Sequence, residues 1–206
     1  MTTSRALIVL GVLSAVVVMG AAVLATPTTE AREPAQDGDI IFQHSRSAQA
    51  TALRHATGSP YTHVGVVFIE GGKPYVYEAN GPVGKVSLNR WIARGDKRHY
   101  VRKRLKNTGG LDFRKLREEV RRFLRRPYDR GFNWSDKKIY CSELVWKAYK
   151  RAFNLEVGEL KTVRDFNLKS DKVKRLLKKR KITLDMTVIA PSDMFSSDLL
   201  ITVEED

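Results

Sequence analysis

The clearest β-strand signal in the chain is the stretch His63-Val64-Gly65-Val66-Val67-Phe68-Ile69. Its apolar and β-branched residues favour a buried strand. Gly71-Gly72 follow closely, and glycine pairs between two such runs are typical of hairpin turns. The next run, Tyr75-Val76-Tyr77-Glu78-Ala79, again consists largely of strand formers. The sequence therefore predicts two antiparallel strands joined by a tight turn.

The expected register of this hairpin brings polar residues together at its open end. Pairing about a turn at residues 70–73 sets His63 opposite Asn80. By the same register, Gly65 lies opposite Glu78, and the four residues share one face of the sheet. Glu78 is then diagonal to the imidazole, across a glycine that leaves room. A carboxylate or carboxamide at this point can fix the imidazole tautomer and support an imidazolium.

The single cysteine, Cys141, lies at the start of an expected helix that runs to Phe153. Backbone N–H groups and the helix dipole favour a thiolate at such a position, although a small buried thiol fits the same pattern. One cysteine excludes intramolecular disulfides and multi-cysteine metal sites. The expected buried stripe is Leu144, Val145, Ala148 and Tyr149, and the cations expected to face water are Lys147, Lys150 and Arg151.

The other elements differ in periodicity and form no repeat. They are a strand at 40–42, a helix at 47–57, a helix capped by Asp112 with apolar residues at 113, 116, 120, 123 and 124, a basic helix at 171–181, and a strand at 187–190. Pro127 stops the helix that Asp112 begins. We therefore expect one α+β domain with a mainly antiparallel sheet.

Length and charge bound the domain organisation. The chain has 206 residues and a net charge of +14, which fits one domain with a tail. Residues 6–25 form an uncharged apolar run, so residues 1–25 are expected to be either a cleaved signal peptide or a membrane anchor. We expect a linker at 26–36 and a folded domain at 37–206 that works outside the cytoplasmic membrane, in the periplasm or another extracytoplasmic space.

Several motifs occur in a fixed order along this domain. They are Gly38–Gln43, Tyr61–Gly65, Tyr75–Ala79, Gly81–Val83, Arg126–Asp129 and Trp134–Trp146. Together they resemble the YiiX/YebB group of permuted papain-like cysteine hydrolases in the NlpC superfamily, over about residues 37–187. In ordinary papain-like enzymes the cysteine helix precedes the histidine strand, whereas here the histidine comes first. The resemblance implies a circularly permuted papain-like, NlpC-type fold with the cysteine at a helix N-terminus.

The resemblance also implies roles for individual residues. Cys141 matches the family nucleophile, His63 the general base, and Glu78 the acidic residue that orients the base. Asn80 is the alternative for this third position. Tyr128 matches a tyrosine near the nucleophile of NlpC-type amidases, where it positions the substrate or the oxyanion. The backbone N–H of Cys141 supplies one oxyanion donor, and Gln43 is the candidate for a second.

The implied reaction is acyl transfer through a thioester, with no metal and no organic cofactor. An amide in a peptide, such as a cell-wall peptide, is the leading substrate by family analogy. Two alternatives stay open: an acyltransferase or lipase acting on lipid acyl groups, and a catalytically silent basic module of the cell envelope. The spacing of His44, His55, His63 and Cys141 matches no simple metal-ligand motif.

The excess charge predicts a strongly basic surface. Residues 101–126 hold 11 Lys or Arg against three Asp or Glu, and residues 172–181 add seven more cations. Anionic envelope polymers or a membrane surface are the expected partners, while a solvated basic face is the simpler explanation. Nucleic acid is an unlikely partner, because no aromatic-studded basic stripe or known nucleic-acid motif is present. The oligomeric state is open.

Overall fold

The computed structural model describes residues 33–206. The expected signal peptide or anchor at residues 1–25 lies outside this range, as does most of the expected linker at 26–36. Between residues 33 and 206, no helix is long and apolar enough to span a membrane.

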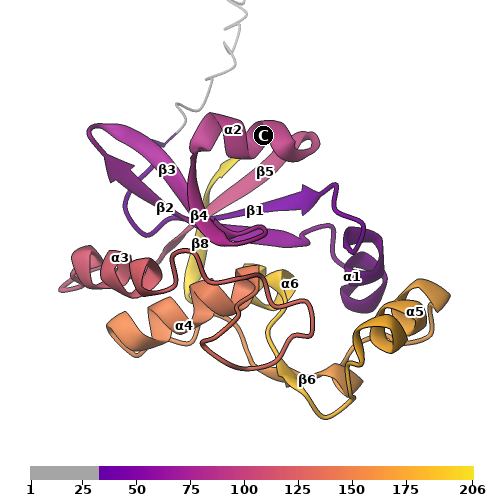
Figure 1. Ribbon diagram of the computed structural model, residues 1–206. Coiled ribbons are helices and arrows are strands. Elements are labelled where there is room, and N and C mark those ends of the chain that lie inside the picture. The colour runs from indigo at the N-terminus through magenta and orange to yellow at the C-terminus, as the bar shows by residue number, and fades with distance from the viewer. Residues whose placement is uncertain (1–32) are drawn as a thin grey trace, which may run out of the picture. The chain divides into compact units, whose positions relative to one another are not determined.

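A six-stranded sheet in the order β4-β3-β2-β1-β5-β8 is the centre of the fold, and each neighbouring pair of strands is antiparallel (Figure 1). The strands are β1 (Ile40–Ser45), β2 (His63–Glu70), β3 (Lys73–Ala79), β4 (Val83–Ser87), β5 (Gly95–Leu105) and β8 (Leu200–Glu205). This sheet confirms the expected α+β class with antiparallel pairing.

The hairpin of β2 and β3 has the predicted register. Val66 pairs with Tyr77, and Glu70 pairs with Lys73 across the turn. Continued toward the open end, this register sets Gly65 beside Glu78. The hairpin therefore carries His63 to one end of the sheet, where the site described below is formed.

Helices cover both faces of the sheet (Figure 1). On one face, alternate residues such as Val66 and Phe68 pack against α3 (Phe113–Arg122) and α4 (Cys141–Phe153). On the other face, Val67 packs against the short helix α2 (Leu88–Arg94). The near-continuous apolar run of β2 is thus explained by burial on both sides.

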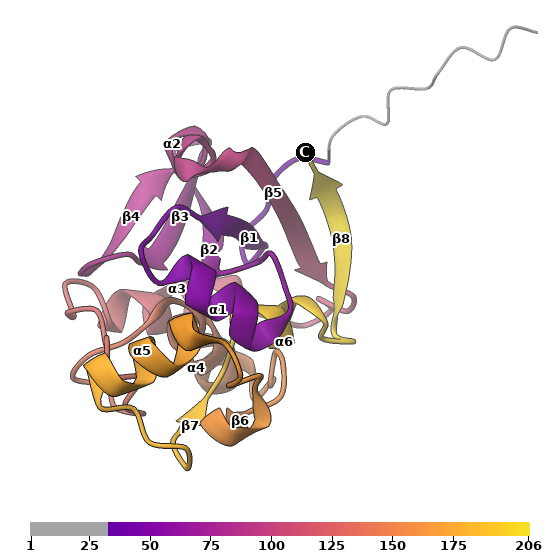
Figure 2. The ribbon, with the colours of Figure 1, turned by 90° about the vertical axis from the view of Figure 1, so that its right-hand side faces the viewer.

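The remaining elements gather near the start of α4. They are α1 (Ala50–Thr57), the two-stranded sheet of β6 (Lys161–Thr162) and β7 (Thr187–Val188), the 3₁₀ turn η1 (Val163–Asp165), α5 (Asp171–Arg180) and α6 (Pro191–Phe195). Figure 2 shows α1 and α5 side by side, far apart in sequence but adjacent in space. The space between α1 and α5 forms a groove.

Two burial predictions were wrong. Lys147 was expected to face water but is 5% exposed, because its ammonium lies between Asp136 and Glu143 at 3.0 and 2.7 Å. Leu124 was expected in the buried stripe of α3 but is 37% exposed. That helix ends at Arg122, so the helical spacing no longer applies two residues later.

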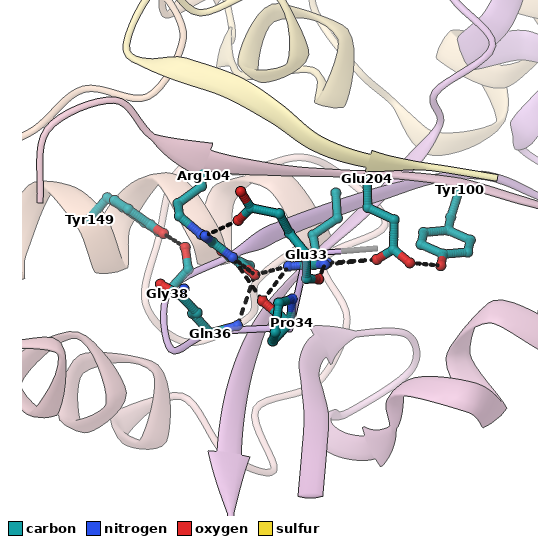
Figure 3. Close-up of polar contacts among 10 residues, drawn as sticks. Glu33, Pro34, Gln36, Gly38, Tyr100, Arg104, Tyr149 and Glu204 are labelled. Atoms are coloured by element: carbon teal, nitrogen blue, oxygen red, sulfur yellow. Dashed lines mark hydrogen bonds and ion pairs between the residues drawn. The ribbon is translucent and has the colours of Figure 1, made fainter. Parts of the chain in front are cut away.

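A buried ion cluster ties both ends of the described chain to β5. Arg102, only 1% exposed, contacts the carboxylates of Asp39 and Glu204. Arg104 reaches Asp39 at 2.7 Å and also binds Glu33 at 2.8 Å (Figure 3). The acidic residues near residue 204, for which the sequence predicted no structural role, thus belong to β8, and the Glu204 carboxylate balances the buried Arg102.

Candidate active site

His63 and Glu78 make the first contact of the site. His63 begins β2, Glu78 lies near the end of β3, and Nε2 of the imidazole is 2.6 Å from Oε2 of the carboxylate. A Cβ atom on the intervening Gly65 would lie 2.5 Å from Cγ1 of Val76 and 2.9 Å from the carbonyl oxygen of Tyr77. Glycine therefore permits the close crossing of the strands on which this contact depends.

Helix α2 holds the carboxylate from the other side. Trp91 donates its indole N–H to Oε2 of Glu78 at 3.0 Å, and Arg94 donates to Oε1. The indole also stacks on the His63 ring, with 5.8 Å between the ring centroids. Sequence reasoning missed both residues, because nothing in residues 88–94 indicates that the helix folds back over this hairpin.

Cys141 lies at the first position of α4 and is 3% exposed. Its sulfur is in hydrogen-bond range of the His63 imidazole and of the backbone N–H groups of Val64 and Ser142. Since Glu78 occupies Nε2, the nitrogen that faces the sulfur is Nδ1. The structure therefore brings Cys141, His63 and Glu78 into one connected line of side chains.

The pKa values of the three groups shift as an ion pair requires. Burial raises the pKa of the Cys141 thiol, but its bonds to His63 and to the backbone N–H groups outweigh burial and lower it overall. Burial lowers the pKa of His63, yet Cys141 and Glu78 outweigh it and raise that pKa to about 10. Burial likewise opposes ionisation of Glu78, while His63 and then Arg94 bring its pKa below the ordinary value. The directions of these shifts thus favour the charged pair, a thiolate and an imidazolium, over the neutral pair.

Tyr128 lies next to this pair. Its hydroxyl accepts a hydrogen bond of 2.9 Å from Nε2 of Gln49, a residue just before α1, and it lies close to the Cys141 sulfur. Burial and then the charge of Cys141 raise the pKa of Tyr128, so its hydroxyl keeps its proton. The hydroxyl also hydrogen-bonds to Cys141, so its proton is directed at the sulfur, where it can be donated to a bound group.

The two other expected residues take different positions. Asn80 is exposed just past the end of β3 and lines the mouth of the site together with His63 and Tyr128. Gln43 is the cross-strand neighbour of His63, but its side-chain oxygen packs tightly against Gly95. Within residues 33–206 that oxygen is buried without a hydrogen-bond partner.

A second buried carboxylate, Glu143, lies in the first turn of α4. Oε2 of Glu143 accepts a bond of 3.3 Å from the backbone N–H of Tyr140, and Oε1 lies 2.7 Å from Nζ of Lys147. Burial raises the pKa of Glu143 to about 7, although Lys147 opposes the shift. Glu143 thus supports the turn that presents the cysteine.

Comparison with known proteins shows the family of the chain. Residues 34–204 match the family described as permuted papain-like amidase enzymes, YaeF/YiiX, C92 family. The uncharacterized protein YiiX of Escherichia coli K12 is 44% identical over 177 residues, which cover 83% of this chain and 87% of that protein. This chain belongs to the C92 family of permuted papain-like amidases.

A solved structure supports the fold of this C92 chain. The crystal structure of YiiX from Escherichia coli O157:H7 matches with a TM-score of 0.79 at 44% identity, covering 83% of this chain and 97% of that one. The permuted papain-like fold expected from the sequence is therefore confirmed. Membership at the family level supports a hydrolase of the amidase type.

The E. coli structure is described as that of a metalloprotein. In the described part of this C92 chain, no group of three or more His, Cys, Asp and Glu side chains is placed to hold a metal ion. The residues present therefore do not fit a metal centre. The reaction proposed for this site uses the groups of the chain alone.

An apolar cavity of about 90 Å³ opens beside the sulfur of Cys141. Two polar groups of its wall are bonded within the protein: the Ser142 hydroxyl donates to the Ile189 carbonyl at 2.8 Å, and the Tyr140 hydroxyl accepts from the Ile189 N–H at 3.1 Å. Its apolar lining includes Leu53, Ala56, Phe132, Phe166, Val173, Leu176, Leu177, Ile182 and Val188. The space next to the nucleophile in this C92 chain therefore offers dispersion contacts rather than hydrogen bonds.

Proposed function

We propose that the protein is a cysteine amidase in which Cys141 is the nucleophile, His63 the general base and acid, and Glu78 the residue that orients His63. One observation carries this proposal: the imidazole binds Glu78 through Nε2 and faces the Cys141 sulfur with its other nitrogen. A nucleophile, a base and an orienting carboxylate in such a line are the arrangement used in covalent acyl transfer.

The reaction follows from the protonation states. The Cys141 thiolate attacks the amide carbonyl, and the imidazolium of His63 gives its proton to the leaving nitrogen as the C–N bond breaks. The acyl group is then held as a thioester on Cys141. His63 next takes a proton from water, the hydroxide attacks the thioester, and the thiol and a carboxylic acid are released.

The start of α4 supplies stabilisation for the oxyanion. We assign the backbone N–H of Cys141 as one donor and the Tyr128 hydroxyl, which keeps its proton beside the sulfur, as the second. Gln43 is less well supported in this role, because its side-chain oxygen packs against Gly95 of β5. The sequence offered Tyr128 for this position through its family motif.

The cavity indicates what the acyl part of the substrate carries. A volume of about 90 Å³ is smaller than the roughly 150 Å³ that holds a benzene molecule in an engineered apolar cavity. In this conformation it fits a short apolar group, such as a branched side chain or the first methylenes of an acyl chain. Amides with an apolar acyl part are therefore the proposed substrates.

Two classes of substrate with an apolar acyl part are proposed. Cell-wall peptides contain amides with small acyl parts and fit an exported enzyme, which is the location that the apolar run at residues 6–25 favours. The apolar cavity favours a second candidate, hydrolysis or transfer of lipid acyl groups. An acyltransferase uses an amine or alcohol in place of water at the thioester, so the two activities share every residue named above.

Product analysis tests the proposal. We expect p-nitroanilides with valeryl or leucyl acyl parts to be cleaved, and those with glutamyl or lysyl acyl parts to be cleaved more slowly. Mass spectrometry of a slow substrate should show the acyl group on Cys141, and adding hydroxylamine should divert it to a hydroxamate. Full turnover by a Cys141→Ala variant would refute the mechanism. Transfer to an added alcohol in preference to water would select the acyltransferase.

A further inference from the structure

A basic groove leads away from the active site between α1 and α5. It consists of a hollow of about 200 Å³ beside His63 and Tyr128 and a larger one of about 660 Å³ between the two helices. Arg130 and Arg180 border both hollows, which makes them continuous. The cations of the basic groove are Arg130, Lys172, Arg175, Lys179 and Arg180.

Within residues 33–206, these cations have no counter-charge. Neither hollow is lined by an Asp or a Glu, and none of the five forms an ion pair within residues 33–206. The basic helix α3 differs, because each of its arginines is paired with a carboxylate. The α3 pairs are Arg114 with Asp112, Arg117 with Asp37, Arg121 with Glu70 and Arg122 with Glu119.

Arg180 is held in place rather than free in solvent. Its guanidinium lies over the ring of Phe132, 5.7 Å from the centroid. One of its nitrogens, Nη1, is buried and has no hydrogen-bond partner in the described chain. Burial lowers the pKa of this arginine; Tyr128 opposes the shift, and the neighbouring charge of Arg130 adds to it. Two adjacent cations and an unsatisfied donor are stabilised when an anion binds between them.

The geometry points to the leaving group as the source of that anion. The apolar cavity reaches Cys141, which keeps the acyl part, whereas the basic groove opens beside His63, which protonates the leaving nitrogen. We propose that the basic groove binds a phosphate or carboxylate carried by the leaving group of the substrate, with Arg130 and Arg180 as its principal ligands. This rests on the proposed amidase function and assigns the substrate an apolar acyl part and an anionic leaving group.

Alkylation of the single cysteine tests the groove without any substrate. Iodoacetate carries a carboxylate, and iodoacetamide is its neutral isostere, so the ratio of their rates at Cys141 reports the local preference for an anion. Dividing by the iodoacetamide rate removes changes in the thiol itself. We expect the ratio to fall roughly threefold in Arg130→Gln and in Arg180→Gln, and further in the Lys172→Gln/Arg175→Gln/Lys179→Gln triple variant. Inorganic phosphate should slow iodoacetate more than iodoacetamide.

The control is the Lys73→Gln/Lys115→Gln double variant. Both lysines are exposed and lie outside the basic groove. It removes two charges and should leave the ratio as in the wild type. An equal fall in the control and the groove variants would mean that net charge alone steers the reagent, and an unchanged ratio in every variant would mean that the groove binds no anion. Either result overturns the proposal. If Arg180→Gln does not fold, Arg180→Lys, which keeps the charge, takes its place in the comparison of alkylation rates.

Hydrolysis supplies the second arm. With one acyl part, amides of 4-aminobenzoate should show a higher kcat/KM than amides of 4-aminobenzamide, and the preference should disappear in the groove variants. If neither amide is cleaved but the alkylation ratio responds, the amidase proposal fails while the anion site stands. If phosphate in solution protects but the carboxylate amide is not preferred, the site binds free anions and the leaving-group assignment is wrong.

Discussion

Gly65 is the residue on which the contact between His63 and Glu78 depends. A methyl group there would meet the Val76 side chain and the Tyr77 carbonyl at 2.5 and 2.9 Å, and the backbone cannot yield cheaply. We expect Gly65→Ala to lower the free energy of unfolding by about 1–3 kcal/mol and to reduce kcat/KM. Gly84→Ala on β4 is the matched control, since its nearest contact is 4.0 Å. Equal stability of the two variants by urea denaturation would contradict this account.

Substitution of Glu78 should reduce kcat/KM more than substitution of Arg94. Glu78→Gln removes the negative charge next to a buried imidazole, so we expect kcat/KM to fall on the order of 100-fold. Arg94 is 40% exposed, so water screens its charge and Arg94→Met should reduce kcat/KM by less than about tenfold. Arg90→Met, at an exposed position of the same helix, is the control. A loss from Arg94→Met as large as that from Glu78→Gln would reverse the assignment.

At this scale the sequence was informative about residues on regular elements. Strand periodicity predicted that His63 and Glu78 share a face, and the helix start predicted the position of Cys141. Trp91 and Arg94 were not predicted, because their role depends on how a short helix folds back over the hairpin. Gln43 was predicted near the site, and it does pair with His63 across the strands. The position of its side-chain oxygen against Gly95 could not be predicted, because it depends on tertiary packing.

Glu143 in helix α4 should make the free energy of unfolding depend on pH. Its folded pKa of about 7 exceeds the ordinary value of 4.5, so the folded protein binds this proton more tightly than the unfolded chain. The contribution of the bound Glu143 proton to the free energy of unfolding is therefore complete below about pH 4.5. It is lost as the pH rises through about 7, and it amounts to at most about 3 kcal/mol. We expect unfolding free energies of the wild type and Glu143→Gln, measured from pH 5 to 8, to diverge with rising pH. Parallel curves would contradict this origin.

Element boundaries were predicted best where a cap marks them. The helix from Cys141 to Phe153 was predicted with its observed bounds, and Asp112 caps α3 by accepting the N–H of Arg114 at 3.0 Å. Burial of charged residues was predicted poorly. Lys147 looks solvent-facing by helical spacing, but Glu143 one turn earlier and Asp136 in the preceding loop draw its ammonium inward.

The whole molecule depends on the ion cluster around Arg102. Removing this arginine leaves Asp39, which is fully buried, with one counter-charge fewer. We expect Arg102→Met to lower the free energy of unfolding by about 3–5 kcal/mol, whereas Lys106→Met just past the end of β5 changes it little. Urea denaturation of both variants checks this. A difference between them of less than about 1 kcal/mol would show that the cluster is not needed for stability.

Contacts between distant segments could not be predicted from local pattern. The order of the hairpin strands follows from the sequence, but the pairing of β5 with the C-terminal β8 joins segments about a hundred residues apart. The same limit applies to the basic groove: the sequence predicts a basic surface at residues 172–181, but not that α5 lies beside α1. Figure 2 shows these two helices side by side, with the cations of α5 along the groove between them.

The pH dependence of Cys141 alkylation by iodoacetamide tests the central claim most directly. The full-length wild type and its His63→Ala variant would be compared, and the single cysteine makes the signal unambiguous. The account predicts a thiol pKa well below about 8.5 in the wild type that rises when His63 is removed. An ordinary pKa that is the same in both proteins would show that the two side chains form no ion pair, and the proposed amidase mechanism would be wrong.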